Sequence, residues 1–412
     1  MSDESSPPGI LQPPSEKETK AMKAAPDISV VFVSLLACAL LTSLARATGD
    51  SLAGTDHLVY VGTAIYTGQN SKAIYACRFN TQTGRLTSLE LAAESNNPGF
   101  VFVHPNRRFL YAVKEIGDKK IGKGGAVTAF SINPETGKLT FLNEVAAHGA
   151  HPCHVTVDKT GKYVLVANYF GGTVESFPVG NDGRLGQSAS VVRHSGASVN
   201  RARQEGPHPH SVVVSPDNRF AISADLGIDK LMIYRFSSMD GSLESTNPPH
   251  AEVKPGAGPR HLVFSPNGKF VYVVNELNSS VSAFAWDSER GALHLVETVS
   301  TLPKSFKGGN SGAEIEVSSS GKFLYVSNRG HDSIAVFSID TARGLLTPVE
   351  YVPTQGKTPR HFTIDPSGSY LIVANQESDT IVVFRINTNT GRLTSTGQEL
   401  KVRAPVCVEF AT

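Results

Sequence analysis

The chain has 412 residues with a formal net charge of +1, and 40% of its residues are hydrophobic and 18% charged. This composition is typical of a globular protein. The body of the chain has no Lys/Arg cluster, which argues against nucleic acid as a partner, because phosphate neutralisation supplies most of that affinity. The four cysteines, Cys38, Cys77, Cys153 and Cys407, form no C-x-x-C pair, which argues against a zinc ribbon or a disulfide framework. The sequence leaves open whether Cys77 and Cys407 form a bridge.

The N-terminus predicts a leader rather than a part of the fold. Residues 1–21 are polar and Pro-rich, so we expect a disordered extension, or an untranslated one if translation begins at Met22. Residues 22–47 combine an early lysine, an apolar centre and a final Ala-Arg-Ala cleavage site. This layout predicts a secretory signal peptide.

The leader implies export. We expect a periplasmic or secreted protein with no stable membrane association after cleavage, and a cytoplasmic protein if the leader does not function. The alternatives are an uncleaved membrane anchor and lipidation at Cys38. The apolar run is short for a membrane span, and it continues past Cys38.

From His57 onward the chain repeats. A Gly-x-Leu turn recurs seven times, beginning at Gly84, Gly137, Gly183, Gly241, Gly291, Gly344 and Gly391. The mean spacing of about 51 residues is typical of propeller blades.

Each repeat predicts four short strands. In the fifth repeat they cover residues 261–266, 270–274, 280–286 and 293–299, and Asn267-Gly268 forms the first turn. The second strands are nearly continuous apolar runs, as expected for strands that adjacent blades cover on both faces. Their β-branched and aromatic content favours strand over helix.

The two ends of the repeat region predict how the ring closes. The first repeat begins directly with a second-type strand at residues 58–61, and a lone first-type strand at residues 405–410 follows the seventh repeat. Pairing them removes the exposed sheet edges that an open array would leave. We therefore predict an all-β fold over residues 57–412, a seven-bladed β-propeller closed by pairing the C-terminal strand with the N-terminal blade.

Polar residues concentrate at one face of the predicted ring. In an antiparallel hairpin the start of the first strand and the end of the second strand lie together, and the first strand lines the central channel. From these positions we predict two sets of residues. The expected catalytic residues are His210, Arg260, Glu276 and Arg329. The expected substrate-binding residues are His154, His208, His261, Asn275, Arg360, His361 and Gln376.

The residue types of the catalytic set suit the opening of a lactone. Arg260 and Arg329 would hold an anion or a developing oxyanion, because a guanidinium group binds such oxygens in a fork. Glu276 would activate water, and His210 would protonate the leaving oxygen. The alternative is structural: polar residues that fix the spacing of blades, with Arg260 and Glu276 as a buried ion pair. We expect no metal, because the charges at this face are largely cationic.

The stretch GAGPRHLVFSPNGKFVYVVNELNSSVSAF, residues 256–284, resembles the signature region of the propeller lactonase family. That family includes propeller-type 6-phosphogluconolactonases and the fungal enzyme that lactonises carboxy-cis,cis-muconate. The resemblance extends over residues 57–412, through PHPHSVVVSPDNRF, LYVSNRGHDSIAVFSID and TPRHFTIDPSGSYLIVANQ. The family's proposed site, one His, two Arg and one Glu, falls on the same four residues as the catalytic set above.

The resemblance implies a lactonase that hydrolyses a sugar-acid lactone without a cofactor. The leader favours an unphosphorylated aldonolactone, because phosphorylated sugars are scarce outside the cytoplasm. The alternatives are a muconate-type lactonising cycloisomerase and a non-catalytic propeller scaffold, since fold does not imply function. A small-molecule lactone is the partner that we expect, and the sequence leaves the oligomeric state open.

Overall fold

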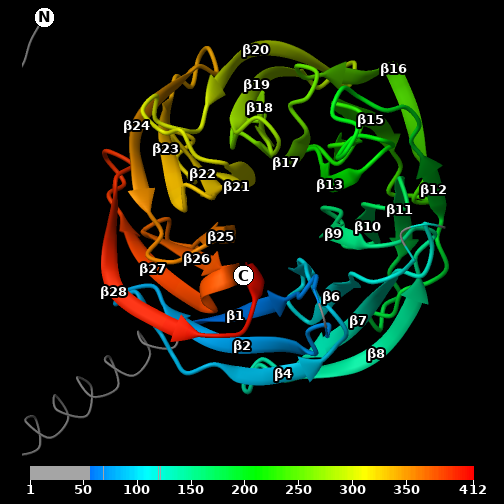
Figure 1. The fold of residues 1–412 in the computed structure, drawn as a ribbon. Coiled ribbons are helices and arrows are strands. Elements are labelled where there is room, and N and C mark those ends of the chain that lie inside the picture. Colours follow the sequence, from blue (N-terminus) through cyan, green and yellow to red (C-terminus); the bar gives the residue numbers. More distant parts are fainter. Residues whose placement is uncertain (1–55, 68, 119, 121) are drawn as a thin grey trace, which may run out of the picture. The chain divides into compact units, whose positions relative to one another are not determined.

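The computed structural model describes residues 56–412 except 68, 119 and 121, so the predicted leader and Cys38 lie outside the described residues. Residues in the described part form seven antiparallel sheets arranged in a ring (Figure 1). The predicted all-β, seven-bladed β-propeller is therefore confirmed. No helix in this part of the chain is long and apolar enough to cross a membrane.

Each blade is one sheet of consecutive strands, numbered here in chain order. Blade 1 contains β1 Asp56–Thr63, β2 Ala73–Asn80, β3 Arg85–Leu86 and β4 Glu90–Glu94, and blade 2 contains β5 Val101–Val103, β6 Phe109–Lys114, β7 Ala126–Ile132 and β8 Leu139–Ala146. Blade 3 contains β9 Pro152–Val157, β10 Tyr163–Asn168, β11 Thr173–Pro178 and β12 Ser190–Arg193. Blade 4 contains β13 Pro209–Val214, β14 Phe220–Asp225, β15 Lys230–Phe236 and β16 Leu243–Glu252.

Blade 5 contains β17 Pro259–Phe264, β18 Phe270–Asn275, β19 Ser280–Asp287 and β20 Ala292–Ser300. Blade 6 contains β21 Ser311–Val317, β22 Phe323–Arg329, β23 Ser333–Ile339 and β24 Leu346–Pro353. Blade 7 contains β25 Pro359–Ile364, β26 Tyr370–Asn375, β27 Thr380–Ile386 and β28 Leu393–Lys401. The short 3-10 helix η1 Gln376–Ser378 follows β26.

The ring closes as predicted. Strand β29, Pro405–Phe410, pairs antiparallel with β1 and supplies the innermost strand of blade 1, with Val408 opposite Val61. On its other edge β1 pairs with β2, so Cys407 and Cys77 lie on strands that flank β1 from opposite sides. Both cysteines are buried free thiols, and the bridge that the sequence left open is not formed.

The seven repeated turn glycines join neighbouring blades. All seven have positive φ between 67° and 83°, a region that favours glycine. A Cβ on Gly183 would lie 2.3 Å from the ring of Phe109, and one on Gly391 would lie 2.4 Å from that of Phe323. Phe109 and Phe323 are each the first residue of the second strand in the preceding blade. The repeat in the sequence therefore reflects a repeated contact between blades.

One type of backbone hydrogen bond recurs around the ring and fixes the residues from which side chains enter the site. In six blades the residue that follows the second strand donates its N–H to a carbonyl that precedes the innermost strand, as in Glu276 to Gly258 at 2.7 Å and Glu115 to Asn97 at 3.0 Å. In blade 6 the corresponding residue, Arg329, ends the second strand and pairs with Ser311. We call the residues at this place the mouth positions. From blade 1 to blade 7 they are Ala64, Glu115, Tyr169, Leu226, Glu276, Arg329 and Gln376.

Candidate active site

A cavity of about 530 Å³ opens at the mouth positions. Every blade contributes to its wall, from blade 1 to blade 7 with Tyr66, Glu115, Cys153, His210, Glu276, Arg329 and Arg360. Three members of the predicted catalytic set, His210, Glu276 and Arg329, line this cavity, and Arg260 lies directly against Glu276.

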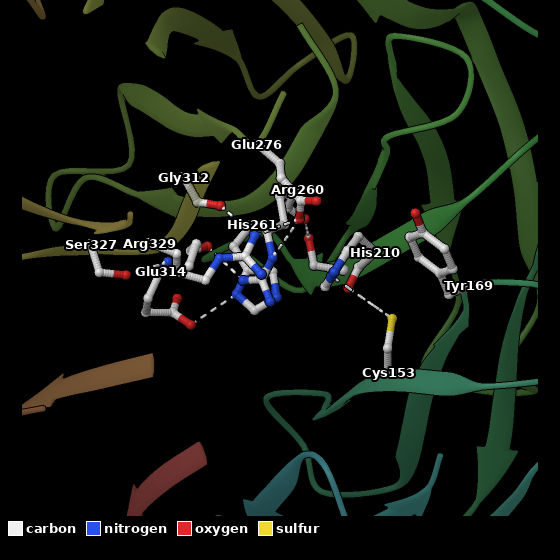
Figure 2. Close-up of polar contacts among 12 residues, drawn as sticks. Cys153, Tyr169, His210, Arg260, His261, Glu276, Gly312, Glu314, Ser327 and Arg329 are labelled. Atoms are coloured by element: carbon white, nitrogen blue, oxygen red, sulfur yellow. Dashed lines mark hydrogen bonds and ion pairs between the residues drawn. The ribbon is translucent and has the colours of Figure 1, made fainter. Parts of the chain in front are cut away.

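Glu276 is surrounded by three guanidinium groups (Figure 2 shows those of Arg260 and Arg329). Its Oε1 accepts a hydrogen bond from Arg203 Nη2 at 2.6 Å, while its Oε2 lies 2.9 Å from Arg329 Nη2 and 3.2 Å from Arg260 Nε. Burial alone would raise the pKa of Glu276, but the three arginines together hold that pKa well below its usual value. Glu276 is therefore ionised at neutral pH and is a weak base.

Backbone carbonyls of blade 6 fix two of these guanidinium groups, one from blade 5 and one from blade 6 itself. Arg260 Nη1 donates to the carbonyl of Ala313 at 2.6 Å, and Arg329 Nη2 donates to that of Gly312 at 2.9 Å. Both carbonyls belong to β21, the innermost strand of blade 6. Burial and the neighbouring Arg329 lower the pKa of Arg260 to about 10, so that the group still carries its charge at neutral pH.

His210 enters the cavity from the start of β13. Its ring stands edge-on to Tyr169, with the ring centres 5.4 Å apart, and its Nδ1 lies 3.8 Å from Cys153 Sγ. Burial and the positive charge of Arg260 hold the pKa of His210 well below the usual value of histidine, so the imidazole is neutral at pH 7. Burial raises the pKa of the Cys153 thiol, which argues against a thiolate nucleophile at this place.

Three further predicted residues, His154, His261 and His361, form a buried layer beside the site. Glu314 Oε2 lies 2.9 Å from His261 Nδ1 and 3.2 Å from His361 Nε2, and the ring of His154 packs on Phe100 at 4.4 Å. His261 and His361 also line a small pocket together with Arg260 and His210. These contacts hold the three rings against neighbouring side chains, and direct contact with substrate stays a prediction.

Known proteins share this architecture. Residues 58–410 match the sequence model of the family described as "Lactonase, 7-bladed beta-propeller". The chain belongs to this family. The 6-phosphogluconolactonase of Bacillus subtilis is 40% identical over 86% of this chain and 99% of its own length.

Solved structures extend the comparison. A putative 6-phosphogluconolactonase from Bacteroides fragilis superposes with a TM-score of 0.80 at 36% identity, covering 87% of this chain and 98% of that one. The periplasmic gluconolactonase of Pseudomonas aeruginosa gives a TM-score of 0.80 at 34% identity, covering 87% of this chain and 99% of that one. Both likenesses span nearly the whole propeller lactonase fold.

Among the other predicted binding residues of this lactonase, only Arg360 lines the cavity. His208 stacks on the ring of Tyr169 at 4.5 Å. The side-chain amide of Asn275 donates to the hydroxyls of Ser280 and Ser282 in its own blade, and that of Gln376 donates to Ala64 in blade 1. The structure therefore places His208, Asn275 and Gln376 outside the cavity wall, because these side chains contact their own blade or a neighbouring blade instead.

Most of the residues that line the cavity of the lactonase were not predicted from the sequence, and four of them carry charged or phenolic side chains. Glu115 and Tyr169 occupy the mouth positions of blades 2 and 3, where the strand-end rule would have found them if applied to those blades. Tyr66 and Arg203 lie on connections between strands, β1–β2 and β12–β13 respectively. The repeat carries no signal for such loop residues.

Proposed function

We propose that this protein hydrolyses a sugar-acid lactone in the mouth cavity, with His210, Arg260, Glu276 and Arg329 as the reacting set. One observation carries the proposal: the neutral, buried imidazole of His210 and the guanidinium group of Arg329, fixed by a backbone carbonyl, line a single cavity, and Arg260 lies directly against Glu276 in its wall. The relatives named as 6-phosphogluconolactonases and as a gluconolactonase support it.

The contacts favour His210 as the group that moves the proton. A neutral imidazole accepts a proton from the water that attacks the lactone carbonyl carbon. The imidazolium formed then gives this proton to the ring oxygen as the carbon–oxygen bond breaks, which yields the hydroxy acid. Because Glu276 is bound by three guanidinium groups, its role differs from the base expected from sequence: it holds the arginines in place.

Arg329 provides the donor for the developing oxyanion. Its Nε is buried and has no hydrogen-bond partner among the described residues, and Arg329 lines the cavity. An N–H that is aimed at the charge forming in the transition state lowers the barrier more than one that binds the ground state. Arg260, anchored behind Glu276, adds a fixed positive charge.

The test is a lactone panel followed by NMR, which separates enzymatic from spontaneous opening. We expect the purified protein to open gluconolactone or 6-phosphogluconolactone faster than the buffer background, and to do so in the presence of EDTA. A rate equal to background on both lactones would contradict the proposal.

The finer proposal is an exported enzyme for an unphosphorylated aldonolactone. It is supported by the signal-peptide pattern at residues 22–47 and by the likeness to a periplasmic gluconolactonase. N-terminal sequencing of the protein recovered from the periplasm or medium should give a start close to residue 48. A mature N-terminus near Met1 would contradict export.

A further inference from the structure

The cavity has two clusters of charged side chains. We call the one around Glu276 the Glu276 pole, and the one that comes from blades 7, 1 and 2 around Glu115 the Glu115 pole. The Tyr66 hydroxyl donates to Glu115 Oε2 at 2.9 Å, and the guanidinium carbon of Arg360 lies 4.7 Å from the centre of the Tyr66 ring. A cation above an aromatic face is attracted to it. All three side chains line the cavity that also contains His210 and Glu276.

The chain holds this pole in place by specific local contacts. The Asn97 side chain accepts hydrogen bonds from the backbone N–H groups of Ile65 and Ser71, and so fixes the β1–β2 connection that carries Tyr66. A Cβ on Gly99 would lie only 2.2 Å from Glu115 Oε2, so the carboxylate uses the space that glycine leaves. Glu115 is buried at 7% exposure, while Tyr66 is 42% exposed and can be reached from the cavity.

The positive charge of the cavity is concentrated at Glu276. Arg203, Arg260 and Arg329 contact that carboxylate, whereas Glu115 meets the Tyr66 hydroxyl and Arg360 lies over the Tyr66 ring. Sugar hydroxyl groups can donate hydrogen bonds to the Glu115 carboxylate. A phosphate ester would bring about −1.5 to −2 charge beside it.

We infer that Tyr66, Glu115 and Arg360 form a binding subsite that recognises the hydroxyl groups of an unphosphorylated aldonolactone and disfavours a phosphate ester. The inference rests on the proposed function, since it places the lactone carbonyl at His210 and the polyol tail at Glu115; both residues also line one small pocket. The Glu115 carboxylate accepts hydrogen bonds from sugar hydroxyls and repels a phosphate. Tyr66 and Arg360 keep the carboxylate in its position.

Two variants test the subsite. Glu115→Gln retains the shape and removes the charge, and Tyr66→Phe removes only the hydroxyl at a half-exposed position, so that folding is preserved. We expect Glu115→Gln to raise KM for gluconolactone by about 10-fold or more, as expected for a lost charged hydrogen bond. KM for 6-phosphogluconolactone should stay unchanged or fall, and Tyr66→Phe should shift the same ratio by less. The matched control is Glu144→Gln on β8, a carboxylate of the same blade outside the cavity wall.

Calorimetry with the stable products separates the subsite from the activity. Wild-type protein should bind gluconate more tightly than 6-phosphogluconate, and Glu115→Gln should abolish or reverse this preference. Equal effects of Glu115→Gln on both ligands, or none on either, would overturn the subsite even if the protein is an active lactonase. If neither lactone is opened but gluconate binding depends on Glu115, the proposed function fails and the subsite stands.

Discussion

Glu276 and Glu115 occupy equivalent mouth positions in blades 5 and 2, yet their surroundings differ. Both backbone N–H groups donate to a carbonyl that precedes the innermost strand of the same blade. Glu276 meets three guanidinium groups, whereas Glu115 receives the hydroxyl of Tyr66. The repeated strand geometry therefore decides where a side chain enters the cavity, and the neighbouring blades and connections decide what it does there.

The largest effect should come from the imidazole beside the Glu276 pole. His210→Asn keeps a polar side chain but removes the group that transfers the proton, so we expect kcat to fall by about 10³-fold with KM little changed. The measurement is steady-state hydrolysis of gluconolactone and 6-phosphogluconolactone. His294→Asn, at an exposed position on β20, serves as the control. A loss below about 10-fold would show that His210 is not the proton-transfer group.

The next effect should come from Glu276 itself. Glu276→Gln leaves three guanidinium groups without the charge that holds them together, so we expect kcat to fall by about 10²-fold. Glu276→Gln should therefore lower kcat, whereas Glu115→Gln should mainly raise KM. If both variants changed KM and neither lowered kcat, the two carboxylates would not have the different roles proposed here.

A smaller effect is expected from Arg203. Its side chain is 44% exposed and comes from a strand connection, whereas that of Arg260 is 3% exposed. Arg203→Ala leaves Arg260 and Arg329 on Glu276, so we expect kcat/KM to fall by about 10-fold or less, as for one charged hydrogen bond at a partly open site. An effect as large as that of Glu276→Gln would show that Arg203 is part of the fixed machinery.

The smallest effect concerns pH. Because burial and Arg260 lower the pKa of His210, its neutral form persists below the ordinary histidine value of about 6.5. We expect kcat/KM to change little between about pH 8 and that value, and to fall only at more acidic pH as His210 becomes protonated. The pH profile of wild-type protein checks this, and a decline already centred near pH 6.5 would contradict the neutral-imidazole mechanism.

The fold could be predicted from sequence because its repeat has a physical cause. The turn glycines recur because each packs against a side chain of the preceding blade at a positive φ. The split first blade was evident because the first repeat lacks a first-type strand and one such strand follows the seventh repeat. The structure pairs the two as β1 and β29. Such local and periodic constraints are visible in a single chain.

The site could be predicted only in part. His210, Glu276 and Arg329 were found because strand ends at one face converge, whatever the side chains do. Asn275 and Gln376 share that placement, but their amides bind the blades instead of facing the cavity. Arg203 enters from a connection with no counterpart in the repeat, so its approach to Glu276 depends on tertiary contacts that periodicity does not encode.

The closure of the ring has a consequence for the timing of folding. Strand β29 is synthesised after all seven repeats, at about 5 to 20 residues per second, yet it is the innermost strand of the first blade. Its Cys407 thiol also contacts the carbonyl of Val101 in blade 2. Blade 1 therefore lacks its innermost strand until residues 405–410 have been synthesised. A deletion of residues 405–410 would keep all strands of the other six blades but remove the strand that closes the ring.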